Sequence, residues 1–214
     1  MIFVLNSGTP TPQRRFIKKP LFNFHNSNLK YMDVLVYVAI KSYDNKEGLC
    51  FPSHETIGKR AGLSSDFVID SIKRLESEGC LSVYRHEKFR EPNRSYSNKY
   101  YFPEVEVFNP IPYEIFEATD LTGNEKAMLL LLRQFAKSSI DIFASMDEFV
   151  KVLGLSKQII YKRYNSLIKK GYLTKTKTKG WIKMQKIDWS YPDQIKINHK
   201  ETTMSSKEYN FIVT

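Results

Sequence analysis

The sequence is poor in the patterns that mark secreted and membrane proteins. Its 214 residues include only two cysteines, Cys50 and Cys80, and both sit beside apolar residues. We therefore expect buried free thiols in a reducing compartment and not a disulfide. The apolar run at the start of the chain is too short for a signal peptide or a membrane span, and its basic residues follow the run instead of preceding it. These absences predict a cytoplasmic protein with no membrane partner.

Motifs of catalysis are also missing. The chain has no GxxxxGK[ST] sequence, which argues against a P-loop ATPase, and no His-x-His pair of the kind that holds the metal of rolling-circle nicking enzymes. The four histidines have no metal-ligand spacing among themselves or with the cysteines. We therefore expect no enzyme, no metal, no cofactor and no small-molecule ligand.

One stretch lacks charge of one sign. Residues 156–186, SKQIIYKRYNSLIKKGYLTKTKTKGWIKMQK, contain ten Lys or Arg and no Asp or Glu, although the whole chain carries 23 acidic residues. The full sequence has a net charge of +10 and a pI near 9.4. Such a charge attracts polyanions, either nucleic acid or acidic membranes, and does not choose between them. A solvated basic surface is the alternative. Which of these interpretations applies depends on the structural elements that the stretch forms.

The chain contains a repeat with an offset of 92 residues. Phe51 aligns with Phe143 and Leu75 with Leu167, and Gly-Leu-Ser at 62–64 aligns with Gly-Leu-Ser at 154–156. The alignment needs no gap between residues 50 and 81. Because the matches fall on glycines, cap residues and apolar positions, they indicate one architecture used twice.

Each copy predicts three helices and a β-hairpin. In the first copy, Ser53 and Ser64 are expected to cap the second and third helices, and Gly62 suits a left-handed stop between them. The third helix of the second copy should bury Ile160, Tyr164 and Leu167 along one face. The fold class is therefore α+β, mainly α with small β wings: two tandem winged helix-turn-helix domains. The predicted division is an N-terminal basic arm (1–27), a first domain (28–103), a linker (104–121), a second domain (122–187) and a C-terminal tail (188–214).

The first copy resembles a known family. The motifs Phe-Pro-Ser at 51–53, Gly-Leu-Ser at 62–64 and RLESEG at 74–79 are similar to those of the helix-turn-helix domains of bacterial phage and plasmid replication proteins. The resemblance covers roughly residues 28 to 187. It implies a replication initiator that binds repeated origin sites on double-stranded DNA in the bacterial cytoplasm, associated with a plasmid or the nucleoid. A transcriptional regulator with the same surface, or a protein-interaction module, remains the alternative.

The acid-free stretch falls on the recognition helix and wing of the second copy, the two elements that usually contact DNA. Gln158 and Asn165 can make bidentate contacts to adenine, and Lys157 or Lys162 can reach guanine or phosphate. Tyr161 lies on the same face, or packs against Tyr172 or a neighbouring side chain. The remaining predicted DNA-binding residues of this copy are Lys169, Lys175, Lys177, Lys179 and Lys183.

The first copy is different, because its recognition helix presents Asp66 and Asp70, which repel phosphate. This domain is therefore expected to dimerise, to contact a partner such as replication machinery, or to touch DNA through its wing. Its predicted contacts are Ser65 and Lys73 on the helix and Lys88, Arg90, Arg94, Asn98 and Lys99 on the wing. At the N-terminus, Arg14, Arg15, Lys18 and Lys19 are expected to form either an arm in the minor groove or a mobile tail.

Overall fold

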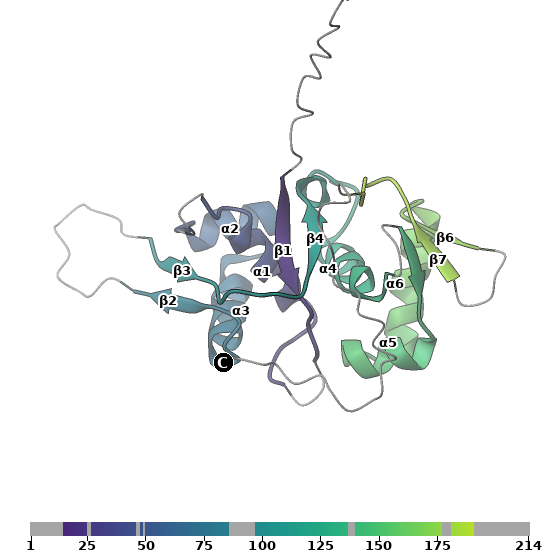
Figure 1. Ribbon diagram of the computed structural model, residues 1–214, viewed down its shortest axis with the longest axis horizontal. Helices are drawn as coiled ribbons and strands as arrows, with labels where there is room; N and C mark the ends of the chain where they lie inside the picture. Colours follow the sequence, from purple (N-terminus) through teal and green to yellow (C-terminus); the bar gives the residue numbers. More distant parts are fainter. Residues whose placement is uncertain are drawn as a thin grey trace, which may run out of the picture.

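Two three-helix units lie on either side of a short central sheet in the computed structural model, and their wings extend at opposite ends of the molecule (Figure 1). The structure describes residues 15–24, 27–45, 48, 50–85, 97–136, 140–176 and 181–190. Among these residues, no helix is long and apolar enough to span a bilayer. Both cysteines are buried and free, and burial raises the pKa of each thiol to about 12.

The first unit has the predicted helix-turn-helix. The Ser53 hydroxyl accepts a hydrogen bond from the N–H of Thr56, and Ser64 caps the third helix in the same way. Gly62 adopts φ 69°, the left-handed geometry that ends the second helix. Residues Cys50 and Tyr100 form an isolated bridge beside the wing. The elements are α1 (Asp33–Lys41), α2 (His54–Ala61), α3 (Ser65–Ser77), β2 (Ser82–Tyr84) and β3 (Lys99–Tyr101).

The second unit repeats this plan with a third strand in its wing. Its strands follow the order β5-β7-β6. Ser145 and Glu148 form a capping box at the start of the helix over Met146–Leu153, and Gly154 ends this helix with φ 62°. The elements are α4 (Gly123–Leu132), η2 (Arg133–Phe135), β5 (Asp141–Phe143), α5 (Met146–Leu153), α6 (Lys157–Lys169), β6 (Leu173–Lys175) and β7 (Trp181–Met184). Two tandem helix-turn-helix domains with small wings are therefore the fold, as predicted.

The central sheet corrects two predictions. Strand β1 (Phe16–Pro20) lies within the predicted N-terminal arm, and β4 (Phe108–Pro112) lies within the predicted linker, where η1 (Tyr113–Phe116) follows it. The two strands pair antiparallel, so residues 16–20 are neither an arm nor a tail. The predicted linker is extended over 108–112 and has a helical turn after it, and the pairing places it in a sheet. Both segments look irregular in the sequence because of their prolines, and only the pairing makes them strands.

The pairing reveals an approximate two-fold relation between the units. Its central pair, Lys18 and Pro110, joins two residues that are 92 positions apart, the same offset as the repeat. The rings of Phe16 and Phe108, also 92 apart, stack with centroids 6.0 Å apart. When an antiparallel ladder is centred on two equivalent residues, a two-fold rotation about that centre exchanges the two strands. Strand β4 is therefore the first element of the second repeat.

Helices α1 and α4, one from each unit, pack against each other and form the middle of a shared core. Every residue of α1 except Lys41 is buried, and every residue of α4 after Asn124 is buried. A helix that is buried on all sides needs neighbours on all sides. Each of these helices is covered by its own unit on one side and by the other unit on the opposite side.

Lys19 is a charged residue in this core. Its side chain is fully buried, and its ammonium donates to the carbonyl oxygen of Pro20 at 3.0 Å and to Oε1 of Gln134 at 3.4 Å. Burial, and then the nearby charge of Arg133, lower the pKa of Lys19 to about 7 from an ordinary value of 10.5. A cationic lysine at this position therefore costs folding free energy.

The Lys19→Met variant should be more stable than the wild type at pH 6, by up to about 4 kcal/mol, because burial lowers the pKa of Lys19 to about 7 and so disfavours the folded cation. Between pH 7 and 10 the unfolded chain binds a proton at Lys19 that the folded chain has lost, so wild-type stability rises with pH in that window. The gap between the two proteins should narrow accordingly. Urea denaturation at several pH values measures it, and a gap that stays constant would contradict a buried, titrating Lys19.

Candidate nucleic-acid interface

Helix α6 presents the acid-free surface outward. Ile160, Tyr164 and Leu167 are buried, as predicted, and anchor one face of the helix in the core. Ser156 caps the first turn by accepting from the N–H of Ile159. The predicted DNA-contacting residues of the helix are all exposed: Lys157, Gln158, Tyr161, Lys162, Asn165 and Lys169.

Two of these side chains have surroundings that the sequence did not indicate. The ammonium of Lys157 lies 2.6 Å from a carboxylate oxygen of Asp147, on the preceding helix, so part of its charge is already compensated. Tyr161 is 49% exposed, whereas Tyr172 is buried and its hydroxyl donates to the carboxylate of Asp120.

Sequence reasoning missed Ile159. This apolar side chain is 40% exposed on α6. An exposed aliphatic side chain on a recognition helix suits contact with the methyl group of thymine. The available signal was helical spacing, since Ile159 falls outside the stripe of Ile160, Tyr164 and Leu167.

The position of α6 is fixed by a buried carboxylate at the start of α4. Glu125 accepts hydrogen bonds from the Ser166 hydroxyl at 2.6 Å and from the Lys170 ammonium at 2.8 Å, and it closes the capping box with Thr122. Burial by itself would raise the pKa of Glu125, but the hydrogen bonds from Lys170, Ser166 and Thr122 lower it to about 2. One ionised carboxylate therefore ties the C-terminal half of the recognition helix to the shared core.

The first unit uses the equivalent carboxylate. Asp33, 92 positions before Glu125, is fully buried and accepts from Arg74 of α3 through Nε at 2.8 Å and Nη2 at 2.7 Å. Arg74 is the equivalent of Ser166. In both units, a buried carboxylate in the first turn of the first helix thus holds the recognition helix, although the donor side chains differ.

The exposed face of α3 differs in charge from that of α6. Position by position, Ser65, Asp66, Asp70 and Lys73 stand where α6 has Lys157, Gln158, Lys162 and Asn165. All four residues of α3 are exposed, and the ammonium of Lys73 pairs with Asp70 at 3.1 Å. The α3 face therefore offers phosphate no uncompensated cation among these four positions.

The predicted wing contacts have mixed surroundings. Lys175 is exposed with its ammonium 5.9 Å from the Tyr164 ring centroid, and Lys183 is half-buried across from Asp141 in the ladder. Asn98 is half-buried, and its amide nitrogen is 3.2 Å from Nε2 of His54. Five further predicted residues lie outside the described part of the chain: Lys88, Arg90, Arg94, Lys177 and Lys179.

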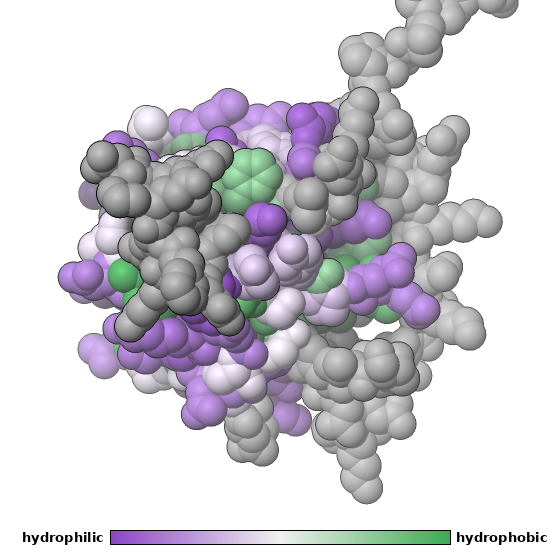
Figure 2. All heavy atoms as spheres, turned by 90° about the vertical axis from the view of Figure 1, so that its left-hand side faces the viewer, coloured by the Kyte–Doolittle hydropathy of each residue, from purple (hydrophilic) through white to green (hydrophobic). Residues whose placement is uncertain are grey.

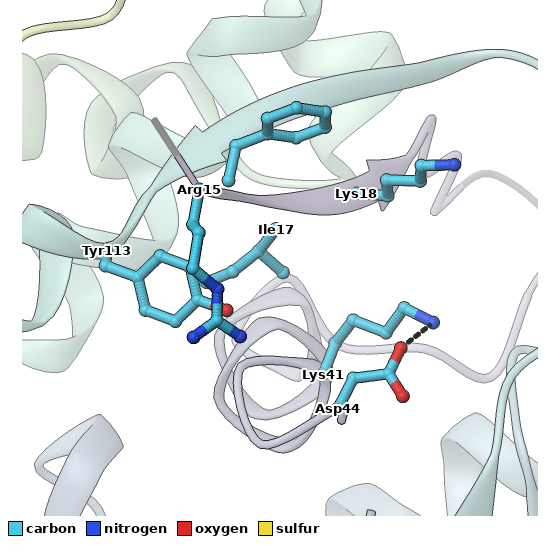
Figure 3. A pocket seen from close by; sticks show the side chains of 7 residues that line it. Arg15, Ile17, Lys18, Lys41, Asp44 and Tyr113 are labelled. Atoms are coloured by element: carbon cyan, nitrogen blue, oxygen red, sulfur yellow. Dashed lines mark ion pairs between the residues drawn. The ribbon is translucent and has the colours of Figure 1, made fainter. Parts of the chain in front are cut away.

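The N-terminal basic residues line a cavity of about 390 Å³ beside α1 (Figure 3). The Arg15 guanidinium lies 5.7 Å from the Tyr113 ring centroid, and the Lys18 ammonium lies 5.0 Å from that of Phe108. These contacts attach the described basic residues to β4 and η1. A free minor-groove arm therefore cannot include them, and Arg14 lies outside the described residues.

Comparison with protein families matches this chain twice. A family model described as a helix-turn-helix domain covers residues 27–81 and 119–173, two segments that together make up just over half of the chain. The chain belongs to this helix-turn-helix domain family. The two matches are offset by the same 92 residues as the repeat, and their helix-turn-helix segments support DNA binding.

A match to one other protein is less informative. The chain is 38% identical over 56 residues to protein YmfN of Escherichia coli strain K12. That segment is 26% of this chain and 12% of YmfN, so the chain spans only a small part of that protein. No solved structure matches the chain.

Two neighbouring residues of α3 test the buried carboxylate. Arg74→Met should destabilise the protein by about 3–5 kcal/mol, because it leaves the carboxylate of Asp33 buried without its cation. Lys73→Met, one position away, removes a cation whose ion pair is mostly exposed and should cost less than about 1 kcal/mol. Urea denaturation followed by circular dichroism gives both values. Similar losses in the two variants would show that Asp33 and Arg74 do not fix the helix.

Changing the α3 face should change DNA affinity without changing the fold. The double variant Asp66→Gln with Asp70→Lys gives α3 the residues that α6 has at those positions. We expect tighter binding to a duplex of random sequence, with a steeper dependence on salt, because two carboxylates are lost and one cation is gained. Fluorescence anisotropy at several salt concentrations measures the change. Unchanged affinity would place α3 away from DNA.

Proposed function

We propose that this protein is a sequence-specific duplex-binding replication initiator of a plasmid or phage, with α6 as its main reading element. The observation that supports this most directly is the exposed face of α6, which carries cations and amide side chains and no carboxylate. Amides and cations are the groups that pair with adenine, guanine and phosphate in the major groove. The proposed role is non-enzymatic, in the cytoplasm.

A division of labour between the units is part of this proposal. The second unit reads bases, whereas the first unit, with its acidic α3 face, contacts replication machinery, a second copy of the chain, or DNA through its wing. A transcriptional regulator is the second candidate, since the α6 surface suits it equally. Footprinting on the DNA beside the gene separates the two roles: an array of protected direct repeats fits an initiator, and one inverted repeat within a promoter fits a regulator.

The residues of α6 should separate by the type of interaction they make. Replacing Lys162 and Lys169 by Ala should weaken binding to every duplex, because fewer phosphates are neutralised. The slope of log K against log salt should fall by roughly 0.9 for each phosphate that the variant leaves without a cation. Replacing Gln158 or Asn165 by Ala should cost about 1–3 kcal/mol on the cognate site and relax the preference at one base position. Binding to random duplexes should hardly change in these amide variants.

Fluorescence anisotropy with cognate and scrambled duplexes over a salt series makes this comparison. Lys59→Ala on α2 is a matched control, because Lys59 is exposed and pairs with Glu55 on its own helix. Equal losses on cognate and scrambled duplexes in all α6 variants would mean that the helix is a basic patch that does not read sequence.

A further inference from the structure

The outer face of the first wing carries exposed aromatic rings. Phe51 is 58% exposed, Tyr84 52% and Tyr101 40%. Figure 2 looks onto the side of the molecule from which this wing extends, where hydrophobic side chains interrupt a mostly hydrophilic surface. Large exposed aromatic side chains that gather on one face mark a binding surface more often than isolated ones do.

The strand register places these rings together. Ser82 pairs with Tyr101 and Tyr84 with Lys99, and residues that pair directly across an antiparallel ladder point to the same face. Tyr100, between the two, is fully buried and points to the core. The opposite, outer face therefore carries both exposed tyrosines together with Lys99.

Phe51 joins the same face from the other side of β3. Its neighbour Cys50 bridges to Tyr100, and both are buried, so the next residue along the chain turns outward beside Lys99. Phe51, Lys99 and Tyr84 thus form a row across the sheet. With strands about 4.8 Å apart, the two rings are roughly 10 Å from each other, and the Lys99 ammonium lies 5.8 Å from the Tyr84 ring centroid.

The second unit has an aromatic pair at the corresponding place. Phe143, the equivalent of Phe51, is 46% exposed and pairs with Trp181 in the ladder, with ring centroids 5.2 Å apart. The next outward residue of that strand is Lys183. The combination of outward rings and a lysine therefore occurs on the wing sheets of both units, although the surfaces of α3 and α6 have diverged.

We propose that the outer face of the first wing sheet binds single-stranded nucleic acid. Unpaired bases stack on Phe51 and Tyr84, and Lys99 between them pairs with a phosphate. A duplex hides the faces of its bases, so this aromatic row selects strands whose bases are free, while the lysine supplies the charge complementarity. This activity goes beyond duplex recognition by α6 and suits a protein that stays bound where a duplex opens.

The experiment uses the full chain and a fluorescein-labelled oligothymidylate. Phe51→Leu and Tyr84→Leu keep apolar bulk and remove the aromatic face, and each should weaken binding about tenfold, the loss of one stacked base. Tyr84→Phe keeps the ring and should bind like the wild type. Thermal unfolding followed by circular dichroism confirms that each variant is folded, and Lys99→Ala should both weaken binding and lower its salt dependence.

Duplex binding separates this proposal from the proposed function. The leucine variants should keep wild-type affinity for duplex DNA, whereas Lys162→Ala with Lys169→Ala should lose duplex affinity and keep most of the affinity for oligothymidylate. If the leucine variants bind oligothymidylate as the wild type does, the stacking face does not exist. If they instead abolish self-association in sedimentation velocity while oligothymidylate binding is unchanged, the face is an interface for a second copy, and the proposal is also overturned.

Discussion

The recognition helices depend on one buried carboxylate in each unit. In the second unit, Glu125 holds α6 through Ser166 and Lys170, and in the first, Asp33 holds α3 through Arg74. Each carboxylate belongs to the first turn of a helix that is buried on all sides, so the cost of burying the charge is offset by several charge-assisted hydrogen bonds. Because these bonds hold the recognition helix from its inner side, the residues on its outer face are not needed to stabilise the fold.

The central ladder decides how the two units are arranged. Because β1 and β4 pair about Lys18 and Pro110, which are equivalent in the repeat, the units face each other across an approximate two-fold relation. A single covalent chain thereby joins two helix-turn-helix units through equivalent strands, as a symmetric dimer joins two subunits. Unlike the subunits of a homodimer, the two halves of one chain can differ in sequence. The exposed faces of α3 and α6 do differ in charge.

Local chemistry made the helices of each unit predictable, whereas the central sheet depends on distant residues. Ser156 caps α6, Gly62 ends α2 with positive φ, and helical spacing indicated the outward face of α6, because each feature involves residues a few positions apart. Basic residues before Pro20 instead suggested an arm, and prolines that include Pro110 and Pro112 suggested a linker, since proline cannot donate to a ladder. All three fall in alternate pairs of the ladder, where the N–H groups point away from the partner strand. Lys19 resembled a basic residue of an arm or tail because its burial depends on distant residues such as Gln134.

The repeat also shows which surfaces the sequence has kept and which it has changed. Between the units, the carboxylate that holds the recognition helix, the helix caps and the outward phenylalanine of the wing sheet recur at the 92-residue offset. The outer faces of the recognition helices do not, since Asp66 and Asp70 stand where Gln158 and Lys162 lie. Recurrence of Asp33 and Glu125 has a structural cause, because both stabilise the fold. The recurrence of an exposed phenylalanine at Phe51 and Phe143 has a partly structural cause, because Phe143 packs against Trp181 across its ladder. Contact with a ligand at the wing is a second cause that fits the exposure of both rings.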